Sequence, residues 1–157
     1  MIGARAYTLV KALPLYAQLM IADPRLKGVR VVGTHGETAA TDGKVIRLPQ
    51  SFLVPKSNMD EAEESAWRDY AYGVMALTTH EVGHVIHTDF PTFQKAASDG
   101  PDSRRKHVLN LLEDPRIDAL MVREQPGVAP MYDALGQRLV REGKEQSVTA
   151  EDAPGDA

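Results

Sequence analysis

The N-terminal part of the chain changes from a helical to a strand-like spacing of apolar residues. Between Tyr7 and Ile21 the apolar residues recur three and four positions apart, which predicts a helix with a kink at Pro14. Three short β-type runs follow, at residues 29–32, 37–41 and 44–48. Asp42-Gly43, between the last two runs, is typical of a two-residue hairpin turn. We therefore expect three antiparallel strands after the first helix.

A long helix is expected in the middle of the chain. From Trp67 to Val85 the apolar residues again recur three and four positions apart, and the acidic run just before them, in residues 61–64, suits a helix N-terminus. Either Asp60 or Ser57 can cap this helix. The helix should end near Phe90, because a residue that precedes proline avoids helical backbone angles.

A further helix is expected after a connection at residues 90–101. Asp102 or Ser103 can cap this helix. Its core face should contain three apolar residues, Val108, Leu111 and Leu112. Alternatively, Asp114 caps a separate helix that begins at Pro115, since proline is favoured at the first helical position.

These elements predict one α+β domain of the zincin-like type at residues 1–142, followed by a polar tail at 143–157. The domain should contain a small three-stranded sheet packed on the long helix, with further helices on its N- and C-terminal sides. The tail contains glycine, proline and several acidic residues, so we expect a disordered segment or a linker there.

The composition narrows the classes of protein that fit this pattern. The chain has 157 residues, which suits one domain, and no cysteine, so a transition-metal site would have to use histidine and carboxylate ligands. Its formal net charge of -4 gives no general reason to expect nucleic-acid binding. We expect no membrane association and a cytoplasmic location, because the sequence has no long apolar run and no signal-peptide pattern.

The candidate chemistry begins with His80-Glu81-Val82-Gly83-His84, in the last turns of the long helix. Residues four apart lie one above the other on a helix, so His80 and His84 can offer two imidazole nitrogens to one zinc ion. Glu81 is turned by one residue and can reach a water on the metal as a general base. His87 shares their face, but it lies about 4.5 Å further along the helix axis than His84. We therefore expect His87 to lie beside the ligands and not to be one of them.

The third ligand should come from Asn110–Asp118, where several acids interrupt an apolar helix. Buried carboxylates are costly unless they are paired or bound to a metal, so this pattern indicates a site. Glu113 is the predicted third zinc ligand, and Asp114 is the alternative. Asp118 is expected to orient a ligand histidine through a hydrogen bond, and Asn110 should lie close to both candidate ligands.

Two segments carry a resemblance to a known family. HEVGHVIHTDF at 80–90 and NLLEDPRID at 110–118 resemble the N-terminal metallopeptidase-like region of proteins related to the cobaltochelatase CobT subunit, which carry a von Willebrand A domain further on. The strands before the motif helix also resemble the gluzincin type of zincin core. The resemblance implies zinc ligation by His80, His84 and Glu113, with Glu81 as the base. It also implies AAA+ ATPases of the MoxR type as partners.

The chain differs from these relatives because it lacks the DxSxS sequence of an A domain. We therefore expect either a small stand-alone relative or the first domain of a longer protein. In either case the motif and the resemblance predict a zinc-dependent metallopeptidase that acts on a peptide or protein substrate, which could pair with the exposed edge of the sheet. The group that stabilises the oxyanion is left open among Tyr70, Tyr72, His107 and Tyr132.

Two other interpretations fit the same sequence. In the first, the chain is a catalytically silent metal-binding module that docks an AAA+ ATPase or a von Willebrand A domain. In the second, no metal is bound and the histidines are polar groups of the core. Glu81 favours hydrolysis over the first of these, because a purely structural zinc site needs no base.

Overall fold

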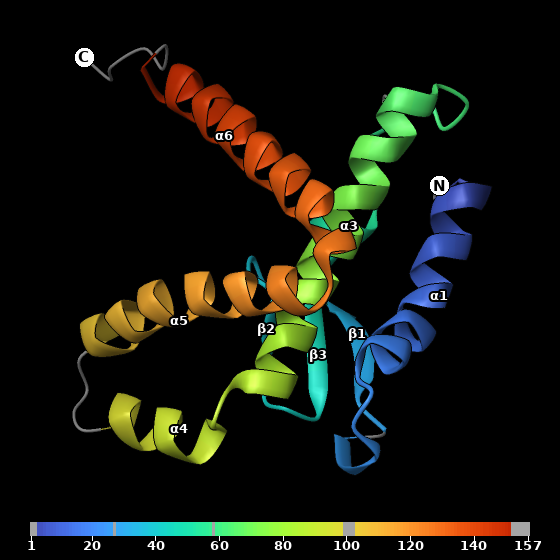
Figure 1. Cartoon of the computed structure of the whole chain (residues 1–157). Helices are drawn as coiled ribbons and strands as arrows, with labels where there is room; N and C mark the ends of the chain where they lie inside the picture. Colours follow the sequence, from blue (N-terminus) through green and yellow to red (C-terminus); the bar gives the residue numbers. More distant parts are fainter. Residues whose placement is uncertain (1–2, 27, 58, 99–102, 152–157) are drawn as a thin grey trace.

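The computed structural model describes residues 3–26, 28–57, 59–98 and 103–151. The chain is mostly helical and carries one small sheet, which agrees with the predicted α+β class (Figure 1). The elements, in chain order, are α1 Ala4–Met20, the 3₁₀ turn η1 Pro24–Leu26, β1 Arg30–Thr34, β2 Ala40–Thr41, β3 Val45–Pro49, α2 Gln50–Leu53, α3 Glu64–His87, α4 Phe90–Ser98, α5 Ser103–Glu124, the 3₁₀ turn η2 Pro126–Val128 and α6 Ala129–Glu151.

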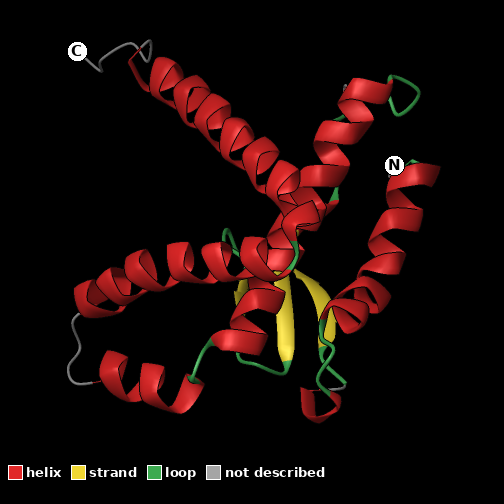
Figure 2. Cartoon of the chain, in the orientation of Figure 1, coloured by secondary structure: helices red, strands yellow, loops and turns green. Residues whose placement is uncertain are grey.

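The three strands form a mixed sheet in which β3 is central (Figure 2). The hairpin predicted around Asp42-Gly43 is confirmed, since β2 and β3 pair antiparallel. Its loop is longer than the two residues predicted, because Thr41 pairs with Ile46 and leaves residues 42–45 between the paired positions. Gly43 has a positive φ of 84°, which glycine adopts readily in such a loop. β1 pairs with β3 in parallel, with Arg30 opposite Val45, so the prediction of an all-antiparallel sheet is wrong. The reason is that β3 enters the sheet between β1 and β2. β2 is consequently an edge strand.

α3 is the central helix and contacts α1, α5, α6 and the sheet (Figure 1). It begins at Glu64, and the carboxylate of Glu63 caps it by accepting hydrogen bonds from two backbone N–H groups of the first turn. The predicted caps, Asp60 and Ser57, are therefore wrong. Asp60 belongs to the preceding turn, where its carboxylate accepts a hydrogen bond of 2.8 Å from the N–H two residues further on. α3 ends at His87, so the histidine motif lies in its last turns, as predicted.

α5 packs on α3 through Ile117 and Met121, which are fully buried. The three apolar residues predicted to face the core are exposed instead, with Val108 at 52%, Leu111 at 58% and Leu112 at 69%. The N-terminal half of α5 extends away from α3 and lies beside α4 (Figure 1). The core face of this helix therefore begins later along the sequence than the pattern predicted.

α5 is continuous through Pro115, so Asp114 does not cap a separate helix and that alternative is wrong. Proline has no N–H to donate to the carbonyl four residues earlier, at Leu111. Both residues are exposed, so water can satisfy this carbonyl and the helix tolerates the proline.

Residues 90–98 form the helix α4 where a connection was predicted. Asp89 stabilises its start, because its carboxylate accepts hydrogen bonds of 3.2 and 2.7 Å from the N–H and the hydroxyl of Thr92. Pro91 lies in the first turn of this helix, where its missing N–H costs nothing. Phe90, where the preceding helix was expected to end, is therefore the first residue of α4 instead.

α6 extends to Glu151, so residues 143–151 continue a helix and do not form the expected tail. Lysine, glutamate, glutamine and alanine in this stretch have high helix propensity, which outweighs the single Gly143. The remainder of the expected tail and the predicted cap Asp102 lie outside the described residues. Within the described part of the chain, no helix combines the length and apolar character needed to cross a membrane.

Gly83 allows α3 and α5 to approach each other closely. A Cβ at this position would lie 2.8 Å from Cγ of Met121 and would also overlap Ile117. We expect Gly83→Ala to lower the free energy of unfolding by about 2 kcal/mol, as overpacked cores do, and urea denaturation would measure this. Gly136→Ala in α6 is the matched control, because no neighbouring atom lies within 4 Å of the added carbon. Equal stabilities of the two variants would contradict this account of the helix packing.

Candidate metal centre

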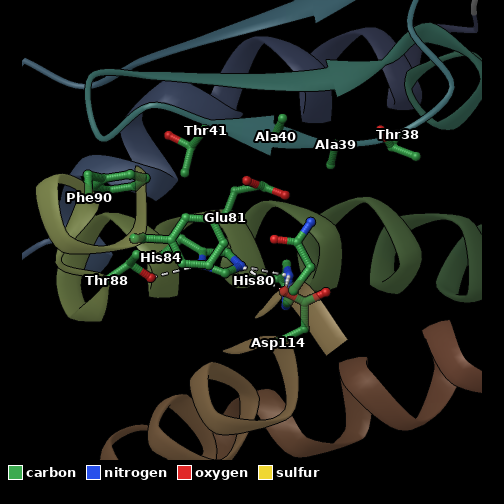
Figure 3. Close-up of a pocket in the computed structure, with 12 residues that line it drawn as sticks. Thr38, Ala39, Ala40, Thr41, His80, Glu81, His84, Thr88, Phe90 and Asp114 are labelled. Atoms are coloured by element: carbon green, nitrogen blue, oxygen red, sulfur yellow. Dashed lines mark hydrogen bonds and ion pairs between the residues drawn. The ribbon is translucent and has the colours of Figure 1, made fainter. Parts of the chain in front are cut away.

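His80 and His84 lie in the last turns of α3, above the helix α5 (Figure 3). Their Nε2 atoms are 3.2 Å apart, and the planes of the two rings are nearly perpendicular, at 82°. Only 17% of the His80 side chain and 15% of the His84 side chain are exposed. The spacing of four residues therefore aims two ring nitrogens at one point, as the helical pattern predicted.

Asp114 of α5 completes a group of three possible metal ligands. Its Oδ1 lies 3.3 Å from Nε2 of His84 and 3.9 Å from Nε2 of His80. In a tetrahedral zinc site with bonds of about 2.0–2.1 Å, the ligand atoms are about 3.3–3.4 Å apart. Two of the three separations, 3.2 and 3.3 Å, are close to these values, and the third, 3.9 Å between Asp114 and His80, is longer. The chemistry of the three residues and their spacing are therefore compatible with a metal ion that keeps one position open.

Asp118, one helical turn after Asp114, contacts the other nitrogen of His80. Its Oδ1 lies 2.8 Å from Nδ1 of His80, which is the orienting contact expected from the sequence. An ionised carboxylate can only accept, so Nδ1 of His80 carries a hydrogen, and in the neutral ring Nε2 then presents a lone pair. The pair of aspartates on α5 thus repeats the i, i+4 spacing of the two histidines on α3.

Glu113, the predicted third ligand, does not lie beside the two histidines. Arg116 donates two hydrogen bonds to its carboxylate, at 2.8 and 2.7 Å, and the hydroxyl of Thr88 donates a third at 2.7 Å. The hydrogen bonds from Arg116 lower the pKa of Glu113 to about 2. Consecutive residues on a helix point about 100° apart, so only one of the neighbouring acids can face the histidines. The structure brings Asp114 to that position.

Glu81 lies on the side of the histidines that faces β2 (Figure 3). Only 3% of this residue is exposed. Burial raises the pKa of Glu81 to about 7, although the charge of His80 partly opposes the shift. A carboxyl group with a pKa near neutrality can both accept a proton and return it, as a general base requires.

The two histidines differ in their preference for the charged form. Burial lowers the pKa of His84, and the charge of His80 lowers it further. Burial also opposes protonation of His80, but the hydrogen bond with Asp118 and the neighbouring carboxylates outweigh it, so the pKa of His80 is raised. Neutral imidazole is the form that binds a metal, and the surroundings of His84 favour that form.

The candidate ligands open into a cavity of about 280 Å³ between β2, α3, α4 and α5. One wall is the segment 38–41, which includes β2 (Figure 3). Phe90 and Phe93 of α4 form an apolar part of the lining, and Phe90 also contacts the hairpin turn at Gly43. An edge strand and an aromatic wall therefore lie beside Glu81 and the candidate ligands.

The remaining predicted site residues occupy different places. Asn110 lines the cavity, one turn before Asp114. His87 lies outside it, with Nε2 at 3.2 Å from the carboxylate of Glu124. The cavity lining contains none of the four residues considered for the oxyanion, namely Tyr70, Tyr72, His107 and Tyr132. Among them, Tyr70 instead donates its hydroxyl hydrogen to the carbonyl of Leu53 at 2.7 Å.

Thr88 is a site residue that the sequence reasoning missed. Its Oγ1 lies 3.0 Å from Nδ1 of His84. The available signal was its position four residues after His84, at the end of the motif helix, where a short hydroxyl side chain can reach the ring.

Comparison with protein-family models, curated proteins and solved structures found no match for this chain. The resemblance to zincins and to CobT-related proteins therefore stays a prediction from the two sequence motifs.

Proposed function

We propose that the chain is a zinc-dependent metallopeptidase. The observation that carries this proposal is the convergence of three atoms, Nε2 of His80, Nε2 of His84 and Oδ1 of Asp114, within 4.8 Å of one another. Both rings face a hydrogen-bond acceptor through Nδ1, so in their neutral forms both Nε2 atoms present lone pairs to the carboxylate. Three electron-rich atoms at such distances repel one another unless a cation lies between them.

Zinc is the cation that best suits these ligands. Two imidazole nitrogens and one carboxylate oxygen, with a fourth position open, are a ligand set of catalytic zinc sites, whereas Ca²⁺ and Mg²⁺ prefer oxygen ligands. When bound by these residues, zinc would polarise the carbonyl of the scissile peptide and acidify a water molecule.

Glu81 would then act as the general base. Its carboxylate would accept the proton of the attacking water and return it to the leaving amine, and its raised pKa of about 7 suits both transfers. A purely structural zinc site needs no such group and usually closes its fourth position. The buried Glu81 beside an open position therefore supports hydrolysis.

The free edge of β2 suits an extended peptide as the substrate. β2 pairs with β3 on one side only, and the backbone groups of an edge strand can bind an added strand. A peptide bound there would cross the cavity beside Glu81 and the ligands. Phe90 and Phe93 offer apolar contacts, and no lysine or arginine is among the described residues that line the cavity. We therefore propose a preference for peptides with an apolar side chain near the scissile bond.

A second candidate function is a metal-binding module that docks an AAA+ ATPase or a von Willebrand A domain without cleaving it. The observation that favours it is the set of exposed apolar residues Val108, Leu111 and Leu112 on α5. Such a module would bind zinc through the same three ligands, but its function would not require Glu81.

Removal and return of zinc test the peptidase proposal. Protein treated with a chelator should lose the ability to cleave an unstructured protein, and one equivalent of zinc should restore it, as followed by mass spectrometry of the fragments. Magnesium or calcium should not restore cleavage, because these ions prefer oxygen ligands. Cleavage that continues after complete metal removal would overturn the proposal.

A further inference from the structure

We infer that Thr88, held by Glu113 and Arg116, positions His84 for metal binding. It does so by favouring the tautomer of His84 that has its hydrogen on Nδ1 and leaves Nε2 free. This inference rests on the proposed function for the identity of the metal, whereas the form of the ring can be measured without any metal. It assigns to Glu113 a part in the site that differs from the predicted role of a ligand.

The contacts form a chain from α5 to the ring of His84. Arg116 donates from Nε and Nη2 to both carboxylate oxygens of Glu113, at 2.8 and 2.7 Å. The hydroxyl of Thr88 donates to Oε1 of Glu113 at 2.7 Å. The oxygen of the same hydroxyl lies 3.0 Å from Nδ1 of His84.

The direction of the last hydrogen bond follows from the others. A hydroxyl group has one hydrogen, and Thr88 uses it toward Glu113, so toward His84 it can only accept. Nδ1 of His84 must then be the donor, and in a neutral ring this leaves Nε2 without a hydrogen. Nε2 is the atom that faces His80 and Asp114.

The same residues also hold the end of α3 in place. Thr88 is the C-cap of this helix, and its N–H donates to the carbonyl of His84 at 3.0 Å. Nη2 of Arg116 donates to the carbonyl of His87 at 3.1 Å. Thr88 is thus bonded to α3 through its backbone N–H and to α5 through its side-chain hydroxyl.

Loss of this chain would release the ring of His84 into a competing form. With hydrogen on Nε2, the ring could donate to Oδ1 of Asp114, which is only 3.3 Å away. That hydrogen bond would occupy the ligand atoms of His84 and Asp114, and it would have to break before a metal could bind to them. Groups that orient a ligand histidine typically change metal affinity by about 10- to 100-fold.

Thr88→Val tests the inference, because valine keeps the shape of threonine and removes the hydroxyl. In zinc-free wild-type protein, long-range ¹H–¹⁵N NMR spectra should assign the hydrogen of His84 to Nδ1, and Thr88→Val should populate the form with hydrogen on Nε2. The zinc affinity, measured by competition with a chromogenic chelator, should fall by about 10- to 100-fold. Thr88→Ser keeps the hydroxyl and so keeps the hydrogen bond with His84 that Thr88→Val loses. It should therefore bind zinc within about threefold of wild type.

Thr92→Val is the matched control. Thr92 also donates its hydroxyl hydrogen to a carboxylate, that of Asp89 at 2.7 Å, but the described contacts link this pair to no histidine. This variant should change neither the form of the His84 ring nor the zinc affinity. If Thr88→Val does not fold, Glu113→Ala gives the same reading, because it frees the hydroxyl of Thr88 to donate to Nδ1 of His84.

The inference is overturned if His84 carries its hydrogen on Nε2 in wild-type protein, or if Thr88→Val keeps both the wild-type ring form and the wild-type affinity. A loss of affinity in Thr88→Ser equal to that in Thr88→Val would overturn it too. A wild-type protein that binds no zinc would contradict the proposed function instead. The NMR comparison would still decide the inference in that case.

Discussion

Asp114→Ala is expected to lower the zinc affinity by about 100- to 1,000-fold. Structural zinc sites bind with about 10–16 kcal/mol shared among four ligands, so the loss of one ligand should remove several kcal/mol. Glu113→Ala is expected to lower the affinity only about tenfold, because Glu113 acts on the site through Thr88 and His84. The two residues are adjacent on α5, so the pair of variants separates a ligand from a residue that orients one.

Chelator competition measures both affinities under the same conditions. Asp133→Ala is a suitable control, since Asp133 is an exposed acid on α6 and does not line the cavity at the candidate site. A larger loss in Glu113→Ala than in Asp114→Ala would contradict the geometry described above and would restore the ligand set predicted from the sequence.

Glu81→Gln is expected to bind zinc as the wild type does and to lose peptide cleavage by at least about 100-fold, as removal of a general base does. Glutamine keeps the size and hydrogen-bonding capacity of the side chain but cannot accept the proton of water. Because Glu81 is buried and its pKa is raised to about 7, removal of its charge should not destabilise the fold. Single-turnover cleavage of a fluorogenic peptide gives the rate, and the zinc content confirms that the site is intact.

Glu64→Gln provides the matched control for this variant. Glu64 lies at the start of the same helix, where its exposed carboxylate contacts Arg5 at 3.2 Å, far along α3 from the histidines. Its variant should cleave at the wild-type rate. If Glu81→Gln cleaves as fast as Glu64→Gln, Glu81 is not the base, and the docking module becomes the better interpretation.

Local spacing was sufficient to predict the part of the site that lies on one helix. His80, Glu81 and His84 depend only on the period of α3, which the apolar pattern identified correctly. The contact between Asp118 and His80 was also expected, since a ligand histidine needs a partner for its second nitrogen.

The identity of the candidate third ligand depends on how α5 is rotated about its own axis, which the sequence did not determine. Val108, Leu111 and Leu112 suggested a core face that the structure leaves in contact with solvent. The residues that are buried against α3, Ile117 and Met121, lie three and seven positions after Asp114 and therefore share its face. This rotation turns Asp114 toward the histidines, whereas Glu113 forms hydrogen bonds with Arg116.

The sheet shows the same limit of local reasoning. Asp42-Gly43 is a strong local signal for a hairpin, and the hairpin was predicted correctly, although its loop is longer than the two residues expected. β1 pairs with β3 although β2 lies between them in the sequence. The residue pattern of a short strand does not specify which other strand it pairs with. The free edge of β2 and the wall that it gives the cavity follow from that order.

The zinc content of the purified protein is the most direct test of metal binding by His80, His84 and Asp114. The chain should be purified without a chelator and without a metal-affinity resin, and its metals should be measured by plasma mass spectrometry. We predict close to one zinc per chain in the wild type and much less in Asp114→Ala. A wild-type protein that holds no zinc, even after zinc is added back, would contradict the account.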